Sequence, residues 1–394
     1  MISSDKTQLT RFQAKVAYPV YLTIGNIPKH IRRKPSYQGQ ILLAYLPTTK
    51  LEHVLNQVSR RHIIMNIFHA CLKFILCPLE KAGVEGELIK SGDGLVRHCF
   101  PILATYIADY PEQVLVTLVK TGECPVCDIS QADMGDINNT RRPRDINPVL
   151  DALNKIGSGA QTFVNACKDI GIKAIPIPFW QDLPFVNIYS SITPDILHQL
   201  YQGMIKHLIS WLIALCRHTE INVRSRCLPM NHHIHHFMKG ISGLSCVTGT
   251  EHDQICHFLL GIVHDIQLPS GYHNERLIQA VRNLLDFVYL ARYPIHTTHT
   301  LDQLEDALTK FHSNATVFID LGIRSHINLP KLHFCSHYWY LIEYFGTTDN
   351  YNTEYTERLH IDLAKDAYRA TNFRDEISQM TTWVHRKEQI LQHD

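Results

Sequence analysis

The stretch from Ile102 to Cys127, ILATYIADYPEQVLVTLVKTGECPVC, indicates how the chain is organised. Its apolar run from Ile102 to Ala108 has the length and composition of a buried strand. The run ends at Asp109, and Pro111 follows at a position where proline commonly begins a helix. The stretch therefore predicts a buried strand, a carboxylate at its end and a new helix. From this context alone, Asp109 is as well suited to capping that helix as to chemistry.

A pair of cysteines, Cys124 and Cys127, closes the same stretch. Two cysteines separated by two residues suit one tetrahedral metal ion, and thiol redox chemistry is the alternative. A redox pair should open a helix directly after a strand, whereas Cys124 follows a predicted helix. This order favours a metal site over a thiol oxidoreductase.

The composition is that of a folded globular protein. Of the 394 residues, 45% are hydrophobic and 19% are charged, and the length suits one large domain or two ordinary ones. The 38 Lys and Arg residues almost balance the 37 Asp and Glu residues, so any binding of DNA must depend on local basic patches. Eleven cysteines without disulfide spacing favour a reducing cytosol or nucleus. The longest apolar run, near Leu208–Cys216, is too short to span a membrane.

The residues before Ile102 predict an α/β arrangement. A strand cut near its beginning ends at Asp5, and a long helix and a glycine-rich hairpin precede the strand that ends at Asp109. The order strand, strand, strand, helix, strand is that of an RNase H-like core. In such a core the first and fourth strands are neighbours, so Asp5 and Asp109 would meet. The segments are two strands at Tyr18–Asn26 and Gln40–Leu46, the helix at Leu51–Leu79 and the hairpin at Gly83–Cys99.

Two local basic clusters lie in polar segments. Either could contact phosphate groups or could be an ordinary solvated loop. The clusters are Arg32, Arg33 and Lys34, and Arg141, Arg142 and Arg144.

The second half of the chain is predicted to be mainly helical. A loop-rich excursion covers Asp128–Gly171, and a strand is expected at Ile172–Trp180. We expect an RNase H-like core in 1–190, a helical insertion in 191–325 and a C-terminal helical part of the core in 326–394. The expected helices of the insertion are Asp195–Arg217, Glu251–Ile266, Glu275–Ala291 and Leu301–His312.

The C-terminal part carries further candidate ligands. His333 and His337 are four residues apart, which on a helix places both on one face and allows them to bind one metal ion. The amphipathic helix Asn352–Ala370 carries Glu354 and Glu357, for which a solvated charged face is the alternative interpretation.

Several long phrases, spread in order over nearly the whole chain, resemble the Plavaka transposases of fungi. They are SDKTQLT, YPVYLTIGNIPKHIRRKPS, DYPEQVLVT, CPVC, ITPDILHQLYQGMIKHL, LPKLHFCSHY and GTTDNYNTEYTERLHIDLAKDAYRATN. These transposases are cut-and-paste DNA transposases of the CACTA/KDZ kind, with an RNase H-like DDE domain.

The resemblance implies a role for each candidate residue. Asp5, Asp109 and Glu357 would be the acidic triad that holds two Mg²⁺ or Mn²⁺ ions, with Glu354 as the alternative third acid. Related transposases also carry a C-x2-C pair after the second Asp and a histidine pair before the Glu. Matching them gives a structural Zn²⁺ site of Cys124, Cys127, His333 and His337. Asp195 and His198 match a D-x2-H element that would support the active site.

The resemblance also implies a function. The chain would be the catalytic domain that cleaves and transfers DNA strands in the nucleus. Its partners would be transposon ends and target DNA, and no membrane would be involved. Whether several copies of the chain form a homo-oligomer stays open. Relatives carry an N-terminal zinc-finger region before the first Asp, so we expect a catalytic-domain fragment with a clipped first strand. An inactive or domesticated remnant that binds DNA or protein is the alternative.

Overall fold

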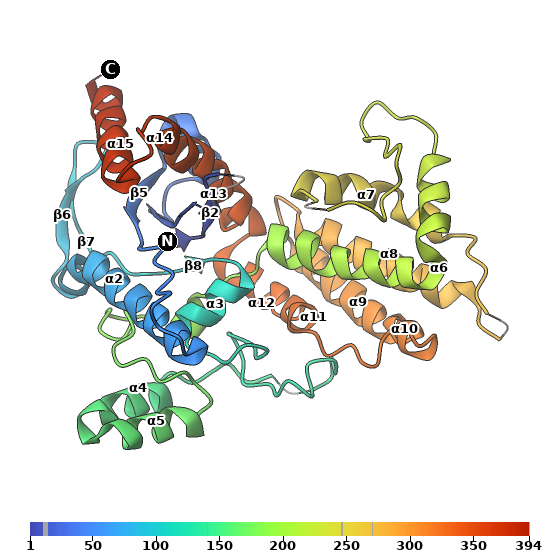
Figure 1. The fold of residues 1–394 in the computed structure, drawn as a ribbon, viewed down its shortest axis with the longest axis horizontal. Helices are drawn as coiled ribbons and strands as arrows, with labels where there is room; N and C mark the ends of the chain where they lie inside the picture. Colours follow the sequence, from blue (N-terminus) through green and yellow to red (C-terminus); the bar gives the residue numbers. More distant parts are fainter. Residues whose placement is uncertain (11–14, 140, 246, 270, 394) are drawn as a thin grey trace.

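The computed structural model describes residues 1–10, 15–139, 141–245, 247–269 and 271–393 (Figure 1). A mixed four-stranded sheet in the order β5-β4-β1-β8 forms the centre of one part of the molecule. β1 is antiparallel to β4 and parallel to β8, and β4 is antiparallel to β5. The strands are β1 (Ile2–Ser4), β4 (Pro19–Thr23), β5 (Gln40–Tyr45) and β8 (Tyr106–Ile107).

The pairing of β1 with β8 determines where the two aspartates lie. Ile2 pairs with Tyr106 and Ser3 with Ile107, and continuing this register places Asp5 opposite Asp109. The prediction that these two strands are neighbours is therefore confirmed, although they are far apart in the sequence.

Helices cover both faces of the sheet. Successive side chains of a strand point to opposite faces, so neighbouring residues of β4 contact different helices. On one face, Val20 of β4 and Phe68 and Leu72 of α2 (Gln57–Glu85) belong to the main hydrophobic core. On the other, Tyr21 stacks on His360 of α13 (Thr353–His360). This second face is also covered by α14 (Asp366–Arg369) and α15 (Glu376–His393), which form a smaller core with Ala17 and Leu42.

α2 has the length and composition of a helix that could cross a membrane, and only 22% of its most apolar window is buried. The sequence analysis predicted no membrane-spanning segment, whereas α2 is long and apolar enough to be one. We interpret α2 as a helix that covers the sheet, because the ring of Phe68 stacks on Tyr18 and the imidazole of His69 bonds to the carbonyl of Leu115.

The second part of the molecule is helical and lies to the right of the sheet in Figure 1. α8 and α9 pack along each other, and hydroxyl-capped turns begin α7 and α9, where Thr248 and Thr297 accept hydrogen bonds from backbone N–H groups. The elements are a π-helical segment (Ile196–Ile205), α6 (Lys206–Arg226), α7 (Gly249–Val263), α8 (Asn274–Ala291), α9 (Thr298–Ala315), α10 (Val317–Asp320), α11 (Pro330–Cys335) and α12 (Tyr338–Phe345).

The remaining elements are short. β6 and β7 form the hairpin that the sequence predicts, and β2 and β3 form another. The elements are β2 (Thr7–Gln8), β3 (Val16–Ala17), α1 (Lys29–Arg32), β6 (Glu87–Lys90), β7 (Val96–Cys99), α3 (Tyr110–Val116), α4 (Asn147–Leu153) and α5 (Ala160–Asp169).

Four details of the prediction were wrong. The strand expected at Ile102–Ala108 has only two paired residues, those of β8. Ile172–Trp180 forms no strand and contributes one isolated bridge, between Val119 and Ile172. The expected loop Asp128–Gly171 contains α4 and α5. His333 and His337 do not share a helix, because α11 ends at Cys335.

Candidate active site and metal centre

Asp109 lies at the junction of β8 and α3. Its Oδ1 accepts a hydrogen bond of 3.0 Å from the backbone N–H of Glu112, so Asp109 caps α3. The capping role considered from the sequence is therefore real. It uses one of the two carboxylate oxygens, and it fixes the side chain at the end of the sheet.

Asp5 lies at the end of the neighbouring strand, in a crowded acidic environment. Burial, followed by the negative charge of Asp109, raises the pKa of Asp5 from its ordinary value of 3.8 to about 7. Glu357 raises this pKa further, whereas the positive charge of His198 lowers it. Asp5, Asp109, His198 and Glu357 are thus close enough to act on one another electrostatically.

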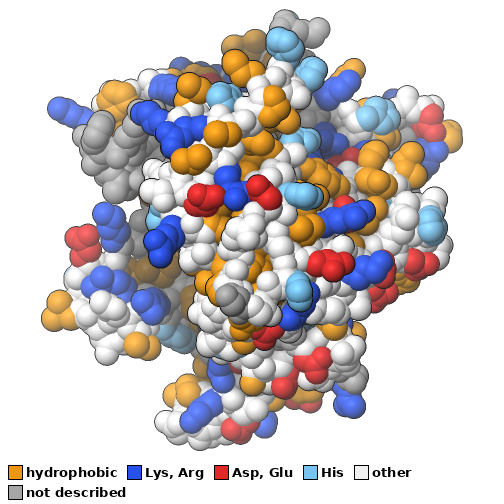
Figure 2. Space-filling view, turned by 90° about the vertical axis from the view of Figure 1, so that its right-hand side faces the viewer, with side chains coloured by type: hydrophobic (Ala, Val, Ile, Leu, Met, Phe, Trp, Pro, Cys, Tyr) orange, Lys and Arg blue, Asp and Glu red, His pale blue; other side chains and the backbone are white. Residues whose placement is uncertain are grey.

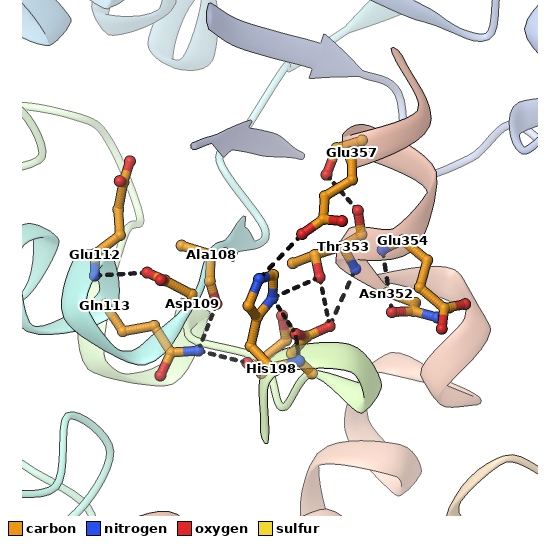
Figure 3. A network of polar contacts seen from close by, with 12 residues as sticks. Ala108, Asp109, Glu112, Gln113, His198, Asn352, Thr353, Glu354 and Glu357 are labelled. Carbon is orange, nitrogen blue, oxygen red and sulfur yellow. Dashed lines mark hydrogen bonds and ion pairs between the residues drawn. The ribbon is translucent and has the colours of Figure 1, made fainter. Parts of the chain in front are cut away.

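His198 connects Glu357 to the beginning of the π-helical segment (Figure 3). Its Nδ1 lies 2.8 Å from Oδ2 of Asp195, and its Nε2 lies 3.0 Å from Oε1 of Glu357. Burial alone would lower the pKa of His198, but the bonds to Asp195 and Glu357 raise it to about 11. The imidazole is therefore a cation at neutral pH.

Asp195 is the buried centre of this network, with a side chain 2% exposed. Its Oδ1 accepts hydrogen bonds from the N–H and the hydroxyl of Thr353, at 3.1 and 2.9 Å. Burial alone would raise the pKa of Asp195, but the bonds from His198 and Thr353 hold it below its ordinary range. The network joins the π-helical segment to the first turn of α13.

Of the two candidate glutamates, Glu357 points toward His198 and Glu354 points away from it (Figure 3). Glu354 is exposed and accepts a hydrogen bond of 2.9 Å from the side-chain amide of Asn352. The side chain of Glu357 is 38% exposed, so it is accessible from the acidic site.

Sequence reasoning missed a further acid, Glu112, which is buried behind the two aspartates. Its carboxyl group accepts a hydrogen bond from Ser4, whose hydroxyl also lies 2.5 Å from that of Tyr106. Burial raises the pKa of Glu112 to about 8, so the group is mainly protonated at neutral pH. The spacing of Asp109 and Glu112 matches an N-cap followed by an acid at the third helical position, a pattern that could have drawn attention to it.

The four predicted zinc ligands come together in one buried group. Sγ of Cys127 lies 3.1 Å from Nε2 of His333, and Sγ of Cys124 lies 3.4 Å from Nε2 of His337. The two Nε2 atoms are 3.2 Å apart, and all four ligand atoms lie within 4.8 Å of one another. Zn–S bonds of about 2.3 Å and Zn–N bonds of about 2.0 Å in a tetrahedron require donor atoms about 3.3–3.8 Å apart. The group is therefore suited to hold a metal ion such as zinc.

The environments of Cys127 and His337 favour the forms that bind a metal, whereas burial raises the pKa of Cys124. Hydrogen bonds from Cys124 and from the two histidines lower the pKa of Cys127, which favours its thiolate. Burial lowers the pKa of His337, which favours the neutral imidazole. Cys335, which lies between the two histidines in the sequence, instead bonds to the carbonyl of Lys331 and is outside the group.

α11 connects this group to the acidic site. Nζ of Lys331 donates a hydrogen bond of 2.8 Å to the carbonyl of His198, and the amide of Gln199 bonds to the carbonyl of Lys331. The absence of a side chain at Gly203 allows this approach, since a Cβ there would lie 2.7 Å from Cδ of Lys331. His333, two residues further along α11, belongs to the Cys2His2 group.

The predicted DNA-binding residues differ in how they are placed. Arg32 is buried at 2% exposure and donates hydrogen bonds to the carbonyls of Gly25 and Asn350, so its guanidinium supports the fold and the DNA-binding assignment does not fit it. Arg33 is half-exposed and pairs with Asp349.

Lys34 is exposed near Arg33, and its ammonium lies over the ring of Tyr37. Arg144 and Arg141 are tied to backbone carbonyls, among them those of Cys124 and Ser336. Arg142 is exposed. Of the six predicted DNA-binding residues, the ones best placed to contact a partner are therefore Arg33, Lys34 and Arg142.

Fold and site together define the class: an α/β protein with a mixed sheet, an acidic site at its edge and a buried Cys2His2 group that can hold a metal. The family model of the Plavaka transposases matches residues 1–212, more than half of the chain. The chain belongs to the Plavaka transposase family, and membership of this family implies DNA binding. None of the curated proteins compared with the chain matches it.

Proposed function

We propose that the chain is the catalytic domain of a DDE transposase, which cleaves and joins DNA strands. The observation that carries this proposal is the meeting of Asp5 and Asp109 at the ends of paired strands, with Glu357 close enough to affect the pKa of Asp5. The strand order β5-β4-β1-β8 is the one expected of an RNase H-like core, with the helical residues 191–325 inserted between Asp109 and Glu357.

Asp5, Asp109 and Glu357 would hold the divalent ions, since carboxylate oxygens are the ligands that Mg²⁺ and Mn²⁺ prefer. When bound, such ions activate a water or a 3′-hydroxyl and stabilise the leaving oxygen of a phosphodiester. The raised pKa of Asp5 supports this role, because a bound cation would stabilise a carboxylate whose charge is disfavoured by burial and by the neighbouring Asp109 and Glu357.

The surrounding residues position the acids. Asp195 fixes the imidazole of His198 through Nδ1, and His198 directs Glu357 through Nε2. Capping of α3 fixes Asp109. Zinc held by the Cys2His2 group would immobilise α11, and through the bond from Lys331 to His198 it would stabilise the same acidic site.

DNA contacts would come from a groove of about 480 Å³ beside α13. Arg33, Lys34 and Arg358 line it, together with Glu354 on the outer side of the acidic site. These cations would contact phosphate groups and position the strand without reading its sequence. A protein with this activity would act in the nucleus.

The alternative is an inactive or domesticated remnant that binds DNA or protein without cutting. The same acidic geometry would persist in a recent remnant, so only chemistry separates the two functions. The alternative predicts DNA binding that is unaffected by divalent ions and by loss of the acids.

Cleavage of labelled DNA with Mg²⁺ or Mn²⁺ tests the proposal. Wild-type protein should nick the DNA only with a divalent ion, and Asp109→Asn and Glu357→Gln should reduce the rate to background. Glu354→Gln tests the other candidate third acid and should keep most of the rate, because Glu354 faces away from His198 (Figure 3). Glu343→Gln, at an exposed position on α12, is the matched control and should keep the full rate. Cleavage that persists in Asp109→Asn would contradict the proposal.

A further inference from the structure

A second large groove lies in the helical part, away from the acidic site. It has a volume of about 750 Å³, which is within the range of pockets that hold small molecules. The walls are formed by the end of the π-helical segment, α6, the first turns of α7, and residues 241–245 and 247. Apolar side chains, among them Ile209, Ile213 and Ile255, form a large part of the lining.

The charged lining of this groove favours an anion. Lys206 and Arg217 bring two cations to it, and His218 brings a third basic side chain. Among the described residues, no carboxylate lines the groove. Figure 2 shows the end of the molecule formed by the helical part, where Lys, Arg and His side chains lie among exposed hydrophobic atoms.

The groove also contains a buried polar group without a partner. His252 lines it and is 3% exposed, and within the described residues its Nδ1 makes no hydrogen bond. A buried polar atom without a partner costs free energy, which a bound ligand able to engage the ring would recover. Arg217, on the opposite wall, has φ 67° and ψ 156°, a left-handed conformation that interrupts α6 where the groove is formed.

The groove and the acidic site border the same helical stretch of the chain. The π-helical segment that carries His198 runs directly into α6 at Lys206, and Gln202 and Lys206 line the groove. A strand that leaves the acidic site along this stretch would therefore reach the groove.

We propose that this groove binds a nucleotide, with the phosphate at Lys206 and the base between the apolar walls near His252. Apolar surface and hydrogen-bonding groups together suit a base, which has a π-face and a polar edge. The nucleotide is either free or part of a DNA strand beyond the acidic site. The second source rests on the proposed function.

Two substitutions test separately how the positive charge and the free volume of the groove contribute to binding. Lys206→Met removes an exposed cation, and Ile213→Trp fills the groove from a half-buried position. Lys239→Gln is the matched control, because Lys239 is an exposed cation of the same helical part that does not line the groove. Thermal unfolding of each variant shows that it is folded.

Calorimetry with dATP, dGTP, dCTP and TTP, with inorganic phosphate as a reference, measures the free source. Fluorescence anisotropy of a labelled duplex with a single-stranded overhang measures the strand source, beside the same DNA with one abasic position in the overhang. Neither measurement needs cleavage, so failure of the proposed function does not decide the result.

Loss of one stacked base should weaken binding about tenfold or more. If free nucleotides bind and both groove variants weaken them about tenfold, the groove takes free nucleotides. If only the overhang DNA binds, and both groove variants and an abasic position weaken it about tenfold, the groove takes a nucleotide of a strand. Binding that Ile213→Trp leaves unchanged, binding that Lys239→Gln weakens equally, or no binding of either ligand would overturn the proposal.

Discussion

Asp5 shows how the acidic site responds to pH. Its pKa of about 7, raised by burial and then by Asp109, means that the folded protein keeps a proton that the unfolded chain loses near pH 3.8. Between these two values the folded state binds more protons, so stability falls as pH rises from about 4 to about 7.

We therefore expect Asp5→Asn, which mimics the protonated side chain, to become progressively more stable than wild-type protein as pH rises from 5 to 7. The measurement is urea unfolding of both proteins in magnesium-free buffer that contains zinc. Mg²⁺ added at pH 7 should stabilise wild-type protein and leave Asp5→Asn unchanged. A stability difference that does not vary with pH would contradict this account.

Residue types and spacing allowed much of the site to be predicted. The acids at strand ends and the Cys and His pairs are visible because their spacing in the chain reflects their chemistry. Burial is not visible in this way: Arg32 and its neighbours Arg33 and Lys34 look alike in sequence, yet only Arg32 is enclosed by carbonyl groups. Glu112 was missed for the same reason, since its environment comes from Ser4 and Tyr106 on other strands.

At the scale of elements, the Cys2His2 group joins the segment that follows α3 to α11 and the residues after it. We expect purified protein to contain one zinc ion per chain, because the four ligands form a closed tetrahedral set. Cys124→Ser and His337→Ala should lose the zinc and the cooperativity of thermal unfolding, and a chelator should have the same effect on wild-type protein.

Cys335→Ser is the control for this prediction, because Cys335 lies between the two histidines in sequence but outside the group. Its zinc content should equal that of wild-type protein. Zinc retained in either Cys124→Ser or His337→Ala would show that the two halves do not share one ion.

The joint between the π-helical segment and α13 depends on Asp195. We expect Asp195→Ala to lower the free energy of unfolding by about 3 kcal/mol, because it leaves His198 and Thr353 without their buried partner. Chemical unfolding measures this change. Asn352→Ala, which removes the N-cap of α13 and the bond to Glu354, should cost about 1 kcal/mol and serves as the comparison. Equal losses of unfolding free energy in the two variants would mean that Asp195 contributes no more to the stability of this contact than an ordinary helix cap.

Elements were predicted well where one pattern dominates. α8 and α9 have amphipathic sequences and clear beginnings, and the structure has both close to the expected bounds. β8 is shorter than its apolar run because Ile102 is exposed and only Tyr106 and Ile107 pair with β1. α4 and α5 were missed because they are short, with 7 and 10 residues, and lie in a stretch rich in Asn, Asp, Arg and Gly.

At the scale of the whole molecule, the chain is almost neutral, with a formal net charge of +1. We expect binding to DNA that is weak, without sequence preference and sensitive to salt. With Arg33, Lys34 and Arg358 as the main phosphate contacts, log K should fall with log salt at a slope of about −3.

Fluorescence anisotropy across a series of salt concentrations measures this slope. Replacing Arg33 and Lys34 together by Gln should reduce its magnitude by about 2. Lys310→Gln, an exposed cation on α9, should leave it unchanged. A sequence-specific footprint at moderate salt would contradict the prediction.

The order of elements made the sheet predictable, since neighbouring strands follow from chain order in a core of this kind. The relation between distant segments was less predictable. The contact of Lys331 with His198, for example, depends on the absence of a side chain at Gly203, and no local sequence pattern predicts it.

The central claim is that three acids from distant parts of the chain form one site for divalent ions. Anomalous diffraction from crystals soaked in Mn²⁺ tests it most directly. We predict manganese peaks within bonding distance of Asp5, Asp109 and Glu357, and none there in crystals of Asp109→Asn. Ordered Mn²⁺ found only at other residues, with these three carboxylates unliganded, would contradict the account.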